Sequence, residues 1–328
     1  MDGLALRLLE RLLRGGGGPV AGLAGALGCG LGAVVGAAEA LRGAGCVIDE
    51  HPQGGLSLSA SGLGCWADYV EWRHGSGLGG RCLVYRETAS TQEAARRAVR
   101  RWSDEGRGRG LVVLADHQSA GRGRLGRRWV DRPGEAVLMT VALRGGATAD
   151  RLMLGACIAV CETVEALGGP APTIRWPNDV LIDGRKLAGM LIEREGEDWL
   201  LGLGLNVGAA DEATDEATDE AAGGGGEGGR PASLRAEGVA SDRLRVVDAL
   251  LGRLGEAVGG RDDAGLLAGW RARSGLVGRR ATASCDGREL RGRVVDLDAR
   301  EGLVMAVDRG PIVRLPAATT RLSEVGGV

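Results

Sequence analysis

The first sixty residues have the hydrophobic pattern of short helices followed by a hairpin. Residues 4–13 (LALRLLERLL) carry apolar side chains every three or four positions, which is typical of an amphipathic helix. Glycine-rich breaks separate this segment from residues 19–27 and 31–43, which we predict as two further helices. Residues 46–58 alternate around a Gly-Gly turn, as the two strands of a hairpin do. This order predicts a winged helix-turn-helix module over residues 1–62.

A different pattern begins near residue 81, after a segment, 63–80, that we interpret as a linker. Apolar runs of strand length alternate there with longer helical periodicities, which predicts an α+β fold with a central mixed α/β domain over residues 81–274. The predicted strands are 81–86, 110–116, 136–143, 173–176, 179–182, 185–193 and 198–206. The predicted helices are 91–103, 150–167 and 242–258.

Two later segments depart from this pattern. Residues 211–229 repeat the sequence DEAT and continue into glycine, a composition that cannot bury enough apolar surface to order itself, so we predict a flexible surface loop. Residues 275–328 contain short strands separated by turn signals such as Asp286-Gly287, which predicts a small β-barrel.

Charge and cysteine content narrow the class of protein. The net charge of -2 and the pI of about 6.1 are unlike those of a protein that binds nucleic acid over its whole surface. The seven cysteines include no C-x-x-C pair, so we expect neither a metal site nor a disulfide. No signal peptide precedes the helices and no apolar run reaches the roughly 18 residues of a membrane span, so we expect a cytoplasmic protein without a membrane partner.

The rarest residue types point to candidate functional positions. Among 41 lysine and arginine residues only one, Lys186, is lysine, and the two asparagines are Asn178 and Asn206. Arginine cannot replace lysine where a compact, flexible ammonium group must reach a reacting centre. We therefore rank these three positions above the others as candidate site residues.

The segment 121–129 (GRGRLGRRW) follows an apolar strand and is the first candidate site. Three glycines let the backbone approach an anion closely, and four arginines can neutralise phosphate or carboxylate oxygens. No G-K-[ST] follows, so the segment is not a Walker-type phosphate loop. A solvated or RNA-binding Gly/Arg tract, like residues 106–110, is the alternative interpretation.

The second candidate site is a hairpin with the sequence RWPNDVLIDGRKLAGM. An Asp-Gly pair at 183–184 lies between two apolar runs, which is a strong signal for a two-residue turn. Such a turn pairs Leu181 with Lys186 and Asp179 with Ala188. Asp179 and Lys186 then lie on one face, about 7–8 Å apart at the backbone. An ordinary cross-strand ion pair is the alternative.

Two weaker signals accompany these sites. Ser90 and Thr91 open the helix predicted at 91–103, and Ser90 and Glu93 also have the spacing of a capping box. A hydroxyl group has one donor and two acceptor sites, so capping leaves capacity for a ligand. In residues 201–206 (LGLGLN), glycines alternate toward a terminal amide.

Together these segments resemble the biotin protein ligases. That family has an S-T-N/Q helix start, a G-R-G-R-x-G-R-x-W loop, a W-P-N-D hairpin leading to K-x-x-G, and a G-x-G-x-N strand, and all occur here in this order within residues 81–275. The resemblance implies a catalytic domain of the class II synthetase and biotin–lipoate ligase type, between a winged helix and an SH3-like barrel. It implies that ATP and biotin, with Mg²⁺, form biotinyl-5′-AMP and that biotin passes to a lysine of a biotin carboxyl carrier protein.

The resemblance also implies roles for single residues. Lys186 would stabilise charge that builds up between the biotin carboxylate and the α-phosphate, and Asp179 would either orient Lys186 or help to deprotonate the acceptor lysine. The implied catalytic residues are Lys186, Arg122, Arg124 and Asp179. The implied biotin-binding residues are Ser90, Thr91, Gln92, Gln118, Gly121, Arg122, Gly123, Arg124, Lys186 and Gly189. The implied ATP-binding residues are Arg124, Trp129, Asn178, Lys186 and Asn206. This account requires Arg122, Arg124 and Lys186 to face one cavity.

Several alternatives stay open at this point. In the resembled family a winged helix marks a repressor of biotin-synthesis genes, but the predicted recognition helix offers only Arg42 for DNA and no other side chain suited to base edges. A packing module is therefore the competing interpretation. A lipoate–protein ligase and a biotin-sensing regulator without ligase activity are alternative functions, and the sequence leaves homodimer formation undecided.

Overall fold

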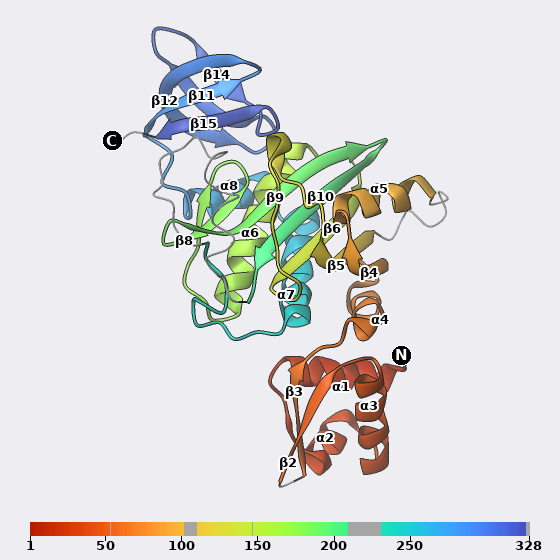
Figure 1. Cartoon of the computed structure of the whole chain (residues 1–328). Coiled ribbons are helices and arrows are strands. Elements are labelled where there is room, and N and C mark those ends of the chain that lie inside the picture. The colour runs from red at the N-terminus through yellow and green to blue at the C-terminus, as the bar shows by residue number, and fades with distance from the viewer. Residues whose placement is uncertain (53, 102–109, 146, 209–230, 326–328) are drawn as a thin grey trace.

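The structure is a computed structural model that describes residues 1–52, 54–101, 110–145, 147–208 and 231–325. An N-terminal module, a central sheet with helices and a C-terminal sheet follow one another along the long axis of the molecule (Figure 1). The predicted flexible loop at 211–229 lies outside the described residues.

Three helices and a small sheet form the N-terminal module. The first helix begins where the Asp2 carboxylate accepts a hydrogen bond from the N–H of Ala5. These elements confirm the predicted helices and hairpin. The helices are α1 (Gly3–Leu13), α2 (Val20–Leu27) and α3 (Leu31–Gly43), and the strands are β1 (Gly18–Pro19), β2 (Val47–His51) and β3 (Gly55–Ala60), in the order β1-β3-β2.

Seven strands form the central sheet in the order β4-β5-β6-β10-β9-β8-β7. β4 and β5 are parallel, and all other neighbours are antiparallel. The seven predicted strands are confirmed, with ends that differ by two residues or fewer. The strands are β4 (Arg81–Thr88), β5 (Leu111–Gln118), β6 (Ala136–Arg144), β7 (Thr173–Arg175), β8 (Asp179–Ile182), β9 (Arg185–Glu195) and β10 (Asp198–Asn206).

Helices cover both faces of this sheet, which explains why the strands are apolar on both sides (Figure 1). In β5, Val112 belongs to the main core with the buried side of α6, whereas Val113 packs in a separate cluster with α5. The last predicted helix continues into a short π-helical turn, and α8 was not predicted. The helices are α5 (Thr91–Arg101), α6 (Ala149–Ala166), α7 (Arg243–Gly255) and α8 (Asp263–Arg271).

The segment predicted as a linker contains a helix. α4 (Leu63–His74) buries Trp66 and Tyr69 and packs on β4 and α7. Its apolar residues are interspersed with Asp, Glu and Arg, so the sequence shows no clear helical period. Just before it, the backbone N–H and the hydroxyl of Ser61 both donate to Asp242, which also caps α7. These contacts attach the N-terminal module to the central unit.

The C-terminal unit is an antiparallel sheet in the order β14-β13-β12-β11-β15. Its β11–β12 turn has Asp286 and Gly287 at φ 48° and 77°, as the Asp-Gly signal predicted. The N–H of Ala317 donates to Asp150 of α6, 2.7 Å away, and joins this unit to the central one. The strands are β11 (Arg280–Cys285), β12 (Arg288–Asp298), β13 (Gly302–Val307), β14 (Ile312–Leu315) and β15 (Thr320–Val325).

No single helix in the described part of the chain is long and apolar enough to cross a membrane. The pair α2 and α3 reaches the necessary length and hydropathy only when the two helices are joined across a bend of 98°. The seven cysteines are all free.

Candidate active site

The β8–β9 hairpin brings Lys186 and Asp179 together. Its turn residues Asp183 and Gly184 have φ values of 49° and 75°, the geometry that Asp-Gly sequences adopt in tight hairpins. The Lys186 Nζ lies 2.8 Å from Asp179 Oδ1. The predicted proximity of ammonium and carboxylate is therefore confirmed.

The register of this hairpin differs from the prediction at one point. Asp179 lies opposite Gly189 rather than Ala188. The pairing shifts because Leu187 is an extra, bulged residue in β9. Leu187 and Ala188 are both fully buried, which strict alternation of inward and outward side chains would not allow.

Two cations keep the Asp179 carboxylate ionised. Arg175 Nη2 lies 2.9 Å from Oδ2, while Lys186 occupies Oδ1. Burial raises the pKa of Asp179, but Lys186 and Arg175 outweigh that effect and hold the pKa below its ordinary value. The Asp179 side chain is 14% exposed and that of Lys186 37%, so the ammonium group stays within reach of a ligand.

Two glycines make a flat floor beside Lys186. Gly189 of β9 and Gly204 of β10 are cross-strand partners, and the Trp129 ring lies over both. A Cβ at Gly204 would lie 2.4 Å from the ring, and a Cβ at Gly189 would lie 3.3 Å from it. The Lys186 Nζ lies 5.7 Å from the centroid of that ring. A side chain at position 204 of β10 would therefore collide with the Trp129 ring, which explains the glycine there.

The glycine–arginine loop, residues 121–129, folds back on itself. The N–H of Trp129 donates to the Gly121 carbonyl at 3.0 Å, and the tip turns through Leu125 and Gly126, whose φ values are 57° and 79°. A Cβ at Gly121 would lie 2.4 Å from the Trp129 carbonyl oxygen, so this position requires glycine.

The loop arginines pair with groups other than Lys186 and Asp179, so the expectation that Arg122, Arg124 and Lys186 face one cavity stays a prediction. Arg122 is held by Glu93 at 2.7 Å and Glu193 at 2.9 Å. Arg124 donates to Asn178 Oδ1 and to the Thr320 carbonyl, both at 3.1 Å, and to the Ala317 carbonyl. Burial lowers the pKa of the Arg124 guanidinium. Nearby carboxylates and carbonyls, rather than the loop sequence, therefore determine where the two arginine side chains point.

The start of α5 gathers the other candidate residues. The Ser90 hydroxyl accepts from the N–H of Gln92 at 3.2 Å, and the N–H of Thr91 donates to Gln118 Oε1 at 2.8 Å. Glu93 pairs with Arg96 and Arg122, so the predicted capping box with Ser90 is not formed. Gln92 Nε2 donates to the Leu200 carbonyl and to Glu193, and its Oε1 is buried without a partner.

Comparison with known proteins assigns the chain to a family. Residues 85–208 match the biotin/lipoate A/B protein ligase family. The chain is 34% identical over 215 residues to biotin--[acetyl-CoA-carboxylase] ligase of Mycobacterium tuberculosis, an alignment that covers 62% of this chain and 76% of that protein. It is 33% identical to the protein of the same name from Paracoccus denitrificans, covering 63% of this chain and 88% of that one. The chain is a biotin protein ligase family member.

Two further known proteins resemble this chain over a shorter length or at lower identity. With the bifunctional ligase/repressor BirA of Bacillus subtilis the identity is 36%, but the alignment spans only 39% of this chain and 41% of that protein. The biotin protein ligase of Aquifex aeolicus in complex with biotin and ATP has a similar fold, with a TM-score of 0.60 and 22% identity over 74% of this chain and 97% of that chain.

In this biotin protein ligase fold the two rare asparagines bind backbone groups. Asn178 Nδ2 donates to the Met190 carbonyl at 3.0 Å, and Asn206 Nδ2 donates to the Ala232 carbonyl at 3.1 Å. Asn178 also accepts from Arg124, which joins the hairpin to the loop. The rarity signal therefore selected residues that organise the candidate site.

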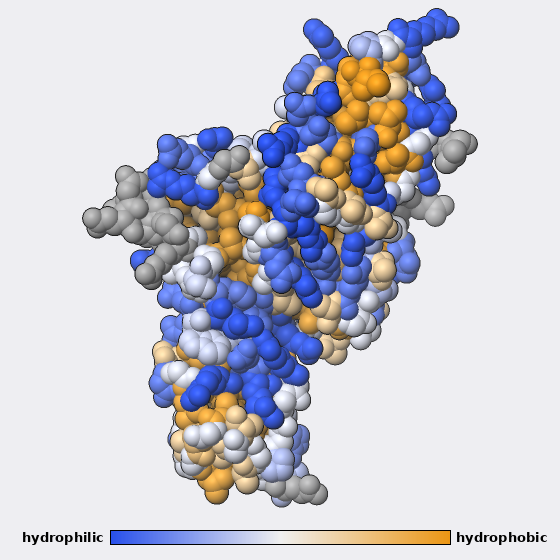
Figure 2. Space-filling view, turned by 180° about the vertical axis from the view of Figure 1, so that it is seen from behind, coloured by the Kyte–Doolittle hydropathy of each residue, from blue (hydrophilic) through white to orange (hydrophobic). Residues whose placement is uncertain are grey.

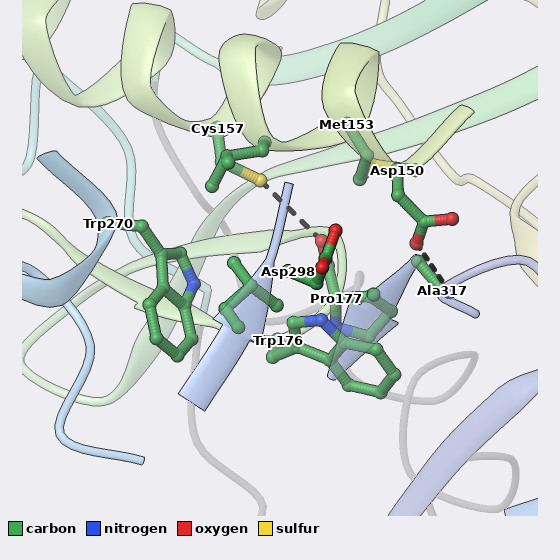
Figure 3. A pocket seen from close by; sticks show the side chains of 11 residues that line it. Asp150, Met153, Cys157, Trp176, Pro177, Trp270, Asp298 and Ala317 are labelled. Atoms are coloured by element: carbon green, nitrogen blue, oxygen red, sulfur yellow. Dashed lines mark hydrogen bonds between the residues drawn. The ribbon is translucent and has the colours of Figure 1, made fainter. Parts of the chain in front are cut away.

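Among the described residues, a smaller and a larger cavity lie between the central and C-terminal units. In the smaller one, Cys157 of α6 points toward Pro177, and Asp150 toward Ala317 (Figure 3). Its volume of about 10 Å³ leaves no room for a substrate. The other has a volume of about 110 Å³ and is lined in part by Arg124 and Leu125 of the loop. Ligand pockets usually measure roughly 300–1,000 Å³, so binding a substrate here requires the loop to move.

Two residues near this site were not predicted. Glu193 binds both Arg122 and Gln92, and nothing in its sequence context indicated such a role. Thr140 donates to the Thr91 hydroxyl at 2.9 Å. Thr140 had a signal, because it is the one polar residue within the apolar run 136–143.

Proposed function

We propose that this protein uses ATP to convert biotin to biotinyl-5′-AMP and then transfers the biotin to a lysine of a biotin carboxyl carrier protein. The Lys186–Asp179 pair beside the glycine floor carries this proposal, because it presents one compact, partly exposed cation next to the Trp129 ring that covers the floor. Membership of the biotin protein ligase family supports it, as do the relatives named for ligation to acetyl-CoA carboxylase.

Lys186 is the proposed catalytic residue. When the biotin carboxylate attacks the α-phosphate of ATP, negative charge builds up on the phosphate oxygens and pyrophosphate leaves. A preorganised ammonium group stabilises that charge more in the transition state than in the ground state. The planar guanidinium group of arginine is too broad to occupy the same point between carboxylate and phosphate.

Asp179 fits the orienting role better than the role of a base. Both of its oxygens are occupied by cations, and these hold its pKa below the ordinary value. A carboxylate with a lowered pKa is a poor acceptor for the proton of an amine. Asp179 therefore positions Lys186 in this proposal.

The remaining site residues are proposed to hold the two substrates. Ser90, Thr91, Gln92 and Gln118 surround the start of α5 and would receive the ureido ring of biotin. The backbone N–H groups of Gly121 and Gly123, with Arg122 and Arg124, would hold the carboxylate and phosphates after the loop moves. Trp129, Asn178, Asn206 and Gly189 would contact the adenylate or the chain of biotin.

Mg²⁺ would arrive with ATP in this proposal. The described residues contain no group of three or more His, Cys, Asp or Glu side chains that could hold a metal ion. Mg²⁺ commonly binds through substrate phosphates with few protein ligands, so such a cluster is not required.

We further interpret residues 1–62 as a winged helix-turn-helix, 81–274 as the catalytic domain and 275–328 as an SH3-like barrel. The free cysteines suit a cytoplasmic protein.

The proposal includes neither DNA binding nor a homodimer. The exposed side of α3 carries Leu31 and Val35, in agreement with the apolar surface on this module in Figure 2, and Arg42 is held by Glu50.

The test is a reaction of the purified full chain with ATP, Mg²⁺, biotin and a biotin carrier domain, followed by mass spectrometry of the carrier. Biotin on a single carrier lysine is the expected product. A parallel reaction with lipoate and a lipoyl domain tests the main alternative. Modification of the lipoyl domain alone would replace the proposal with lipoate ligation.

A further inference from the structure

Strand β6 contains a buried hydroxyl group that needs an explanation. Thr140 lies between Met139 and Val141, and all three are 0% exposed. A buried hydroxyl without a hydrogen-bond partner is costly, so the partner of Thr140 indicates why it is retained. That partner is the hydroxyl of Thr91 at the start of α5, 2.9 Å away.

In the hydrogen bonds that join Thr140, Thr91 and Gln118, only one assignment of donors and acceptors is possible. The N–H of Thr91 can only donate, so the Gln118 atom 2.8 Å from it must be the carbonyl oxygen Oε1. The Thr91 hydroxyl lies 3.1 Å from the same oxygen and donates its single proton there. Thr91 then has no proton for Thr140, so Thr140 must be the donor in the first bond. We call this chain of hydrogen bonds, Thr140 to Thr91 to Gln118, the hydroxyl relay.

The hydroxyl relay determines which end of the Gln118 amide is available. Because Oε1 faces Thr91, the Nε2 group faces the loop, where a Cβ at Gly121 would lie 3.2 Å from it. Nε2 donates to no group in the described part of the chain. The backbone of Gln118 is held as well, since its N–H donates to the buried Asp131 carboxylate at 3.3 Å.

We propose that Thr140 is a positioning residue that makes the site select a ligand carbonyl oxygen. Through the hydroxyl relay it fixes the Gln118 amide so that Nε2, with its two hydrogens, faces the ligand. The inference rests on the proposed function, in which the ureido carbonyl of biotin is the oxygen that Nε2 meets. The cyclic guanidine analogue 2-iminobiotin presents hydrogens at that point, so the hydroxyl relay disfavours it.

The test compares Thr140→Val, which keeps the shape of threonine but loses the donor, with Thr140→Ser, which keeps the donor. The assay is ligand-dependent exchange of labelled pyrophosphate into ATP by the full chain, with biotin or 2-iminobiotin. Loss of one buried hydrogen bond in Thr140→Val should raise KM for biotin about tenfold and leave KM for ATP within about twofold. The preference for biotin over 2-iminobiotin should fall about fivefold or more.

Thr140→Ser should stay within about threefold of the wild type in every parameter, because the relay persists. Equal losses in both variants, or an unchanged biotin preference in Thr140→Val, would overturn the inference. If Thr140→Val does not fold, Thr140→Cys replaces it. Because a thiol is a weak donor, its KM for biotin should lie between that of the serine variant and a value about tenfold above the wild type. Absence of biotin-dependent exchange in the wild type itself would instead refute the proposed function.

Discussion

The β8–β9 hairpin and the glycine–arginine loop both carry family motifs, but different forces hold their side chains. In the hairpin, a two-residue turn and a strand ladder bring Lys186 to 2.8 Å from Asp179. In the loop, 121–129, the turn is equally local, yet Arg122 and Arg124 point to carboxylates and carbonyls on other elements.

The difference follows from side-chain length and from what lies nearby. A residue on a ladder has its direction fixed by the pleat, whereas an arginine has several rotatable bonds and reaches the nearest strong acceptor. In the proposed function the hairpin is therefore a preformed part of the site, and the loop would exchange its present partners for a substrate.

The largest expected effect comes from replacing the hairpin cation. Lys186→Arg should lower the rate of biotinyl-adenylate formation by roughly a hundredfold or more, because it removes a preorganised charge at the reacting centre. Biotin-dependent pyrophosphate exchange measures this step. The melting temperature should stay close to that of the wild type. A variant with more than a third of the wild-type rate would remove the role assigned to Lys186.

The two loop arginines should differ in their effect on stability. Arg124→Ala should cost about 2 kcal/mol of unfolding free energy, because the partly buried guanidinium donates to Asn178 and to two carbonyls of the C-terminal unit. Arg122→Ala is the matched control and should cost less than about 1 kcal/mol, since its side chain is 38% exposed. Urea denaturation measures both. Equal costs would contradict the contrast drawn between them.

The ion pair of the hairpin should make a modest, pH-dependent contribution to stability. Asp179→Asn should lower the unfolding free energy at neutral pH by about 1–2 kcal/mol, a value reduced by solvent screening at the partly exposed Lys186. The pKa of Asp179 is lowered in the folded state, so its contribution is complete above the unfolded pKa of about 4 and is lost as the pH falls further.

Urea denaturation of both proteins at several pH values checks this sign. The difference between wild type and Asp179→Asn should be constant from pH 7 to about pH 5 and should shrink below about pH 4. A difference that grows toward acid pH would mean that the carboxylate is not held by the two cations.

Local chemistry explains which parts of the fold the sequence predicted. The Asp-Gly turns at 183–184 and 286–287 and the apolar strands came out correctly because each depends on neighbouring residues. Helices α4 and α8 were missed, since α4 is stabilised by packing of Trp66 and Tyr69 on other elements rather than by its own periodicity.

The candidate site shows the same division. Rarity and motif selected Lys186 and both asparagines, and the structure brings Lys186 to Asp179 and Asn178 to Arg124. The bulge at Leu187 could not be predicted, because it depends on which side chains the core accepts. The partners of the two arginines are Glu93, Glu193, Asn178 and carbonyl groups of the C-terminal unit. None of them lies in the loop itself, and no local pattern encodes them.

A crystal structure of the full chain with a non-hydrolysable analogue of biotinyl-5′-AMP would test the central claim most directly. We expect the Lys186–Asp179 distance to stay near its present 2.8 Å, the ammonium group to contact the linkage between carboxyl and phosphate, and Arg122 to have left Glu93 for the ligand. A ligand bound with Lys186 turned away from that linkage would contradict the account.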